Sequence, residues 1–336
     1  MRILVTGGAG YIGSHTVALL RKVGHEVCVV DNLSTGHRQA VPADCLIQCD
    51  LAERDKLGQA FRARRIEAVM HFAASCYVGE SVTDPAKYYE NNILGTWSLL
   101  EAMRGCNVAS LVFSSTCATY GIPERVPISE ETVQQPVNPY GFTKLVIERA
   151  LIDYARAYGL GAVALRYFNA SGASSDGSLG EDHDPETHLI PLVLQTALGQ
   201  RSHLQILGTD YETPDGTCVR DYIHVEDLAD AHVKALGKVQ PGKFQAFNLG
   251  TGRGYSVREV IDLACRITGR SIPTVEGPRR LGDPPVLVAG AEKARKALGW
   301  EPHYPTLDSI ILTAWRWHAK HPQGYKSHEW SKELTT

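Results

Sequence analysis

The glycine-rich segment Gly7-Gly8-Ala9-Gly10-Tyr11-Ile12-Gly13 decides the fold of this chain. The apolar run Ile3-Leu4-Val5 stands before it and predicts a short buried strand over residues 2–6. Apolar residues then recur through residues 14–24 and predict a helix. Glycines allow a tight turn between strand and helix, and they let backbone N–H groups approach a pyrophosphate at the helix N-terminus. The segment therefore predicts a dinucleotide-binding turn.

An acidic residue ends the next predicted strand. Residues 27–30 are apolar, and Asp31 follows them, 18 residues after Gly13. A carboxylate in this place can accept hydrogen bonds from the adenosine ribose, and it would repel a 2′-phosphate. The sequence therefore favours NAD over NADP. The glycine spacing is Gly7-x-x-Gly10-x-x-Gly13, which differs from Gly-x-Gly-x-x-Gly.

The first half of the chain alternates predicted strands and helices, including a long helix over about 84–103. This alternation predicts the α/β class, a Rossmann-type doubly wound parallel sheet with ligands at the carboxyl ends of the strands. We expect an NAD-binding domain over 1–168, and segments at about 218–250 are candidates for returning to it. Residues 169–336 predict a smaller C-terminal α/β domain that mainly binds the substrate.

Composition excludes several classes of protein. The 336 residues carry 34 Lys and Arg against 37 Asp and Glu, so we expect no nucleic-acid partner. No apolar run approaches the roughly 20 residues that span a bilayer, and the first predicted strand follows Met1 directly, so we expect no membrane partner and no signal peptide. The eight cysteines are scattered without a Cys-x-x-Cys pair, so we expect no metal and free thiols in the cytoplasm.

Three residues predict proton-transfer chemistry. Tyr140 and Lys144 are four residues apart and share one face of a helix predicted to extend to about residue 158. An ammonium beside a phenol stabilises the phenolate, which would make Tyr140 a base near neutral pH. Thr116 follows a strand predicted over 110–113 and offers a hydroxyl to a sugar oxygen. Together they predict a proton-relay set.

These features are similar to those of the extended short-chain dehydrogenase/reductase family, and longer runs resemble the UDP-glucose 4-epimerases within it. The matching runs lie at residues 5–15, 71–74, 78–82, 88–92, 166–169, 219–225, 248–252, 279–283 and 321–325.

The resemblance implies an isomerase that inverts C4 of a UDP-hexose, UDP-galactose to UDP-glucose, through a transient 4-keto sugar. Tyr140 would be the base, Lys144 would lower its pKa and bind the nicotinamide ribose, and Thr116 would hydrogen-bond the sugar. NAD would stay tightly bound and be regenerated within each turnover. The resemblance also implies a homodimer that packs the helices near 84–103 and 140–158 of each subunit.

The resemblance further implies the residues that bind each ligand. Around NAD they are Gly7, Gly10, Tyr11, Ile12, Gly13, Asp31, Asn32, Asp50, Leu51, Phe72, Ala73, Ala74, Asn91, Ser114, Tyr140, Lys144 and Phe168. Around the UDP-sugar they are Thr116, Asn169, His188, Leu189, Arg220, Tyr222, Arg280, Asp283 and Leu287. Guanidinium groups suit a diphosphate because their fork of N–H donors matches phosphate oxygens.

Four positions depart from the family pattern. Thr116 stands where serine is common and keeps the hydroxyl. Cys76 stands where some members have a lysine near the cofactor phosphates, and His188 where an asparagine often contacts UDP. Leu287 aligns with a position whose bulk is associated with the exclusion of N-acetylated sugars. Leucine is intermediate in size, so the sequence leaves a UDP-GlcNAc/UDP-GalNAc 4-epimerase as an alternative function.

Three other functions compete. A UDP-xylose/UDP-arabinose 4-epimerase would share the mechanism and differ in the pocket for C6. A sugar-nucleotide 4,6-dehydratase would need acids after Thr116, where Cys117 and Ala118 stand. A non-catalytic sensor of NAD would keep the glycine turn but could lose Tyr140 and Lys144, which are both present.

Overall fold

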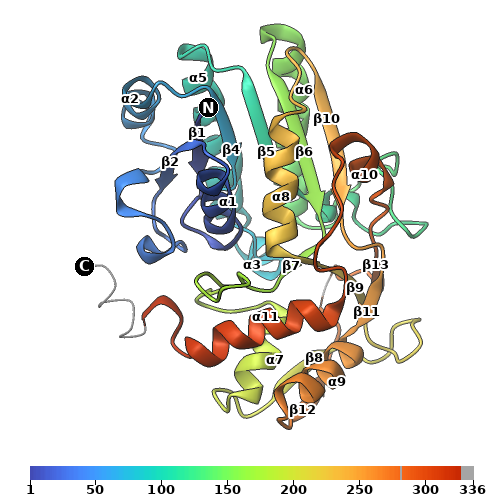
Figure 1. Cartoon of the computed structure of the whole chain (residues 1–336). Coiled ribbons are helices and arrows are strands. Elements are labelled where there is room, and N and C mark those ends of the chain that lie inside the picture. The colour runs from blue at the N-terminus through green and yellow to red at the C-terminus, as the bar shows by residue number, and fades with distance from the viewer. Residues whose placement is uncertain (281, 327–336) are drawn as a thin grey trace.

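The computed structural model describes residues 1–280 and 282–326, so Leu281 and the last ten residues of the predicted C-terminal domain lie outside the described part. A parallel seven-stranded sheet forms the larger part (Figure 1), in the order β10-β6-β5-β4-β1-β2-β3. Its strands are β1 (Arg2–Thr6), β2 (Glu26–Asp31), β3 (Leu46–Gln48), β4 (Ala68–His71), β5 (Ser110–Thr116), β6 (Gly161–Tyr167) and β10 (Phe244–Leu249). The predicted doubly wound sheet is confirmed.

Each face of this sheet has its own hydrophobic core, because successive side chains of a strand point to opposite faces. From β1, Ile3 and Val5 enter one core, and Leu4 enters the other. The first core is closed by α1 (Tyr11–Lys22), α8 (Val225–Leu236) and α10 (Glu292–Leu298). The second is closed by α2 (Arg54–Arg64), α5 (Gly95–Gly105) and α6 (Pro139–Tyr158).

The smaller part is built on β9 (Val219–His224), which pairs with β7 (Asn169–Ser171), β11 (Gly254–Ser256) and β13 (Val286–Leu287). Beside it lie β8 (Leu204–Leu207), β12 (Thr274–Gly277), α7 (Leu189–Ala197), α9 (Val257–Thr268) and α11 (Leu307–Lys320), below the large sheet in Figure 1. The remaining short elements are η1 (Arg38–Ala40), η2 (Ala43–Cys45), α3 (Val78–Thr83), η4 (Cys117–Tyr120) and η5 (Gly324–Lys326). The segment at 218–250 is thus divided, since β9 belongs to the smaller part and β10 to the large sheet.

The helix predicted over 84–103 is interrupted. It consists of α4 (Pro85–Tyr88), the π-helical turn η3 (Tyr89–Leu94) and α5. The buried Asn92 side chain accepts a hydrogen bond from the N–H of Ser75 at 2.8 Å and donates to Thr143 Oγ1 at 3.1 Å. These contacts tie the turn to the loop after β4 and to α6, a tertiary reason for the irregular winding.

Strand β5 is also longer than predicted, because it continues through Ser114 and Ser115 to Thr116. These residues pair with Leu165–Tyr167 of β6. Thr116 therefore ends a strand that is paired with β6 at this point, which fixes its backbone more firmly than the predicted loop would. Among the described residues, no helix has the length and apolar character that crossing a bilayer requires.

A buried ion pair ties α6 to the sheet. Glu148 of α6 and Arg166 of β6 have side chains only 2% and 6% exposed. Arg166 Nε lies 3.0 Å from Glu148 Oε1, and Ser115 Oγ donates to the same oxygen at 2.6 Å. The Nη1 of Arg166 donates to Tyr120 OH at 2.8 Å. Because these contacts satisfy the buried charges, they hold the middle of α6 against β5 and β6.

We predict that Glu148→Gln lowers the free energy of unfolding by about 3–5 kcal/mol, because it leaves the Arg166 charge buried without its counter-ion. Urea-induced unfolding of the NAD-saturated protein measures this loss. Glu301→Gln is the matched control, because Glu301 pairs with Arg295 at the surface and such a pair contributes at most about 1 kcal/mol. Equal losses in the two variants would contradict the prediction.

Candidate functional site

A cleft of about 650 Å³ runs along the carboxyl ends of the central strands and reaches β9 and β13 of the smaller part. All the residues predicted from the sequence to bind NAD or the UDP-sugar, or to carry the chemistry, line it. They come from segments as distant as Gly7 and Leu287. The structure therefore brings the whole predicted set to one place, while the role of each residue stays a prediction.

The glycine turn is shaped to receive a dinucleotide. Gly7 has φ +67°, and a Cβ there would lie 2.5 Å from the backbone nitrogen of Ala73. A Cβ on Gly13 would lie 2.2 Å from the carbonyl oxygen of Gly7. Glycine is therefore required at both positions. Gly10 is the N-cap of α1 and brings no side chain to cap it, so the N–H groups of the first turn are available to a pyrophosphate.

Asp31 is held at the end of β2 by the backbone. Its Oδ2 accepts a hydrogen bond from the N–H of Ala9 at 2.9 Å, and its Oδ1 accepts one from the N–H of Leu33 at 2.8 Å. Burial raises the pKa of Asp31, and these two hydrogen bonds oppose that shift. Each oxygen keeps a lone pair for a ribose hydroxyl, and the adjacent Asn32 donates to Asp50 Oδ2 at 2.7 Å. These contacts fit the adenosine half of NAD.

The proton-relay set lies at the centre of the cleft. Asn138 caps α6 by accepting a hydrogen bond from the N–H of Gly141 at 2.8 Å, which places Tyr140 in the first helical turn. Lys144 lies one turn further along and donates to the carbonyl oxygen of Ser114 at 2.8 Å. Thr116, Tyr140 and Lys144 are all buried. Both the phenol and the ammonium are thus removed from bulk water.

Burial has a consequence that the sequence did not predict. It raises the pKa of Tyr140 well above its ordinary value, although a hydrogen bond from Thr116 lowers it in part. Burial also lowers the pKa of Lys144 to about 8. Desolvation therefore sets the net direction of the Tyr140 pKa, and the expected lowering by Lys144 stays a prediction. The physical reason is that the free energy lost when the phenolate leaves water exceeds the stabilisation that its neighbours, such as Thr116, provide.

The predicted UDP-sugar residues lie at the other end of the cleft. Arg220 of β9 forms a short ion pair with Asp283 and is opposite Leu287 of β13 in the strand register. Tyr222 lies two residues further along β9 and is buried, whereas Arg280 is exposed. The pairing of β9 with β13 thus places Arg220, whose charge suits a diphosphate, beside Leu287, the side chain expected to limit the size of the sugar.

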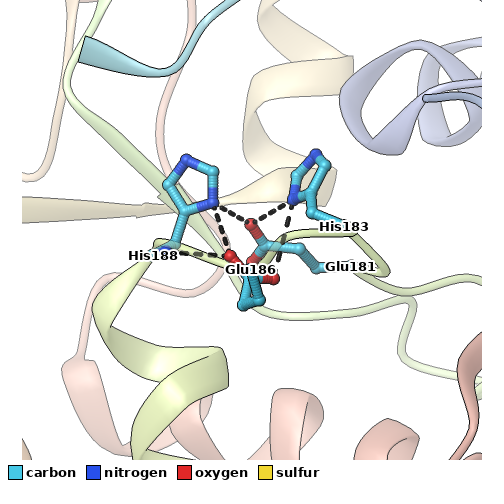
Figure 2. A group of neighbouring side chains, drawn as sticks. All are labelled: Glu181, His183, Glu186 and His188. Carbon is cyan, nitrogen blue, oxygen red and sulfur yellow. Dashed lines mark hydrogen bonds and ion pairs between the residues drawn. The ribbon is translucent and has the colours of Figure 1, made fainter. Parts of the chain in front are cut away.

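One part of the cleft wall was not predicted from the sequence. Glu181, His183, Glu186 and His188 converge in the loop before α7 (Figure 2), and only His188 was predicted as a site residue. Burial alone would lower the pKa of His183, but Glu181 and Glu186 raise it to about 10. Desolvation would raise the pKa of Glu186, but the two histidines lower it. The signal in the sequence was the spacing Glu-x-His-x-x-Glu-x-His.

Known proteins match the chain over nearly all of its length. The model of the NAD dependent epimerase/dehydratase family matches residues 3–250. The UDP-glucose 4-epimerase of Lacticaseibacillus casei is 53% identical over 97% of this chain and 99% of that protein. The crystal structure of UDP-glucose 4-epimerase from Brucella ovis in complex with NAD is 54% identical, with a TM-score of 0.90, over 94% of this chain and 97% of that one.

A third similar protein carries both ligands. The structure of UDP-glucose 4-epimerase from Bifidobacterium longum in complex with NAD⁺ and UDP is 40% identical, with a TM-score of 0.93, over 96% of this chain and 100% of that one. The glycine turn, the buried tyrosine–lysine helix and these full-length similarities agree. The chain therefore belongs to the NAD dependent epimerase/dehydratase family and, within it, to the UDP-glucose 4-epimerases.

Proposed function

We propose that this chain interconverts UDP-galactose and UDP-glucose by inversion at C4, with Tyr140 as the base. The observation that carries the proposal is the position of Thr116, Tyr140 and Lys144. They are buried midway along one cleft, between a glycine turn fitted to a dinucleotide and Arg220 at the far end. The membership of the chain in an NAD-dependent epimerase family supports the same reaction.

Each residue has a distinct task. Tyr140 takes the proton from the sugar 4-hydroxyl and later returns it to the same oxygen, and Thr116 orients that oxygen by a hydrogen bond. Lys144 is held by the carbonyl of Ser114 and would bond the nicotinamide ribose. When bound, NAD⁺ supplies the reversible oxidation of C4 to a ketone and a positive charge that favours the Tyr140 phenolate. The protein thus contributes positioning and proton transfer.

Inversion requires the sugar to turn over while the nucleotide stays anchored. Arg220 and Arg280 would bind the diphosphate, and Tyr222 and Asp283 would complete the UDP end. The sugar end is lined by Thr116 and Asn169 together with apolar side chains such as Phe168 and Leu287. Such a wall offers the sugar few fixed hydrogen bonds, so both C4 faces can be presented in turn. Strong anchoring and weak sugar binding are therefore both supported.

The predicted division into an NAD-binding and a UDP-sugar-binding domain remains part of this proposal, and so does location in the cytoplasm. Within residues 1–280 and 282–326 all eight cysteines are free thiols, and five of them are buried. Free thiols suit a reducing compartment.

Replacing Tyr140 by phenylalanine removes only the phenolic oxygen. We expect Tyr140→Phe to lower kcat for UDP-galactose by about 10²–10⁴-fold, the usual contribution of a general base. Bound NAD, released by acid and measured by absorbance, should stay at the wild-type level. Tyr158→Phe is the matched control, since Tyr158 is an exposed tyrosine of the same helix. Wild-type turnover by Tyr140→Phe would rule out this base and support the NAD-sensor alternative.

The size of residue 287 tests the sugar range. Leu287 is buried at the cleft wall, and a tyrosine there would fill space that an N-acetyl group needs. We expect Leu287→Tyr to lower the ratio of UDP-GalNAc to UDP-galactose turnover by about 10-fold or more, as changes in pocket size commonly do. Leu287→Met, which conserves volume, is the control. An unchanged ratio in Leu287→Tyr would show that this position does not control sugar size.

We also infer a homodimer that packs α5 and α6 of each subunit. Four large apolar side chains are exposed on these helices: Tyr89 (40%) and Leu94 (60%) on η3, Trp97 (52%) on α5 and Phe142 (45%) on α6. Large apolar side chains gathered on neighbouring helices are typical of an interaction surface. A symmetric dimer would bury them against their own copies.

We predict that Trp97→Asp converts the dimer to a monomer, because a carboxylate buried at such an interface has no counter-charge. Sedimentation velocity of the NAD-containing protein measures the change. Val275→Asp is the control, because Val275 is similarly exposed but lies on β12 of the smaller part. A dimer that survives Trp97→Asp, or a wild-type monomer, would contradict the proposed interface.

A further inference from the structure

Four side chains of the loop before α7 point toward a common centre (Figure 2). They are Glu181, His183, Glu186 and His188, and one ligand atom from each lies within 4.8 Å of all the others. The known reaction assigns no task to this arrangement of two imidazoles and two carboxylates. The expectation of no metal rested on cysteine spacing, which does not bear on a site of this composition.

The distances describe a shared centre rather than two separate ion pairs. His188 Nδ1 lies 2.9 Å from Glu181 Oε1 and 2.9 Å from Glu186 Oε1. His183 Nδ1 lies 3.2 Å from Glu181 Oε1 and 3.6 Å from Glu186 Oε2. Each ring nitrogen therefore faces both carboxylates. Ligands bonded to a tetrahedral zinc ion at about 2.0–2.2 Å are separated by about 3.3–3.6 Å. The two His183 distances are near this range, and the two His188 contacts of 2.9 Å would lengthen by a few tenths of an ångström around an ion, roughly 0.4–0.7 Å.

The carboxylates are preorganised and shielded. The side chains of Glu181 and Glu186 are only 4% and 5% exposed. The N–H groups of Thr187 and His188 donate to Glu186 Oε1 at 2.7 and 2.8 Å, which fixes the carboxylate and leaves Oε2 available. Nδ1 of His183 is buried, and it contacts the two carboxylates as an ion pair without a well-directed hydrogen bond. A cation between these groups would bond this nitrogen directly.

Charge and access also fit a cation. The carboxylates raise the pKa values of both His183 and His188, so a divalent ion would displace one proton from each ring. The two carboxylates and two neutral imidazoles that remain sum to −2, which a divalent ion neutralises. A site made of imidazole and carboxylate ligands fits zinc, whereas magnesium and calcium prefer oxygen ligands alone. Glu181 and His183 line both the main cleft and a second cavity of about 340 Å³, which reaches His318 of α11 and offers an entry path. The rings of Tyr11 and Tyr77 pack edge-on against His183 and support its orientation.

We propose that Glu181, His183, Glu186 and His188 bind one divalent transition-metal ion per chain, with zinc as the best-fitting ion. The ion holds the segment between β7 and α7 in place by joining four of its side chains. His188 is the N-cap residue of α7, and Leu189 begins that helix, so the site would fix one wall of the substrate cleft. The proposal does not depend on the epimerase reaction.

Calorimetry on the intact NAD-containing protein tests the site. After treatment with EDTA and dialysis, titration with ZnCl₂ should show one saturable site per chain. Glu186→Gln and His188→Gln should each weaken binding by at least about 10-fold, since lost support around a metal already costs 10–100-fold. His203→Gln, the same change at an exposed histidine elsewhere, should bind as the wild type does. Zinc should raise the Tm of the wild type and not of Glu186→Gln.

Two results would overturn the proposal: a wild-type protein that shows no saturable zinc binding, or unchanged binding in both variants. A second measurement needs no variant at the site. Co²⁺ added to the wild type should give visible absorption bands of a four-coordinate nitrogen and oxygen site, and Cys76→Ser should give the same spectrum. A thiolate charge-transfer band that Cys76→Ser removes would place the ion on the exposed Cys76 and contradict the assignment.

Discussion

The close approach of two loops at the carboxyl edge of the sheet is the constraint on which the rest of this structure depends. Gly7 follows β1 and lies so near Ala73, which follows β4, that a single methyl group would not fit between them. The strand order reverses at this pair of neighbours, because the chain winds outward from β1 in both directions. A crevice forms there, and the N-terminus of α1 opens into it. The position of the cleft therefore follows from a contact between backbones.

The second constraint is the helix α6, which serves chemistry and stability from successive turns of one buried face. Glu148 faces the sheet and pairs with Arg166, while Tyr140 and Lys144 reach the cleft. The buried pair keeps the helix from sliding along β5, so the distance between the helix and Thr116 is set by the core. Burial also raises the pKa of Tyr140 and lowers that of Lys144. The same burial that holds these groups in place opposes their ionisation.

Local patterns were sufficient for most of the fold and for the candidate site. The glycine spacing at Gly7, the acid at Asp31 and the Tyr140–Lys144 pair are each read within a few residues, because turn geometry and helical periodicity are local properties. The matching runs placed Arg220 and Leu287 as well, although their pairing across β9 and β13 is a tertiary contact. Sequence alone left their roles as predictions, and the structure adds that they lie in one cleft.

The sequence by itself thus determined the parallel sheet, the nucleotide turn and the residue types of the proton relay. Only the tertiary structure decided the π-helical turn at Tyr89–Leu94, the direction of the Tyr140 pKa and the convergence of the Glu181–His188 segment. The physical reason is the range of the interactions. Propensity and spacing act between neighbours along the chain, whereas desolvation, ion pairing and the path of a loop depend on groups that only the packed fold brings together.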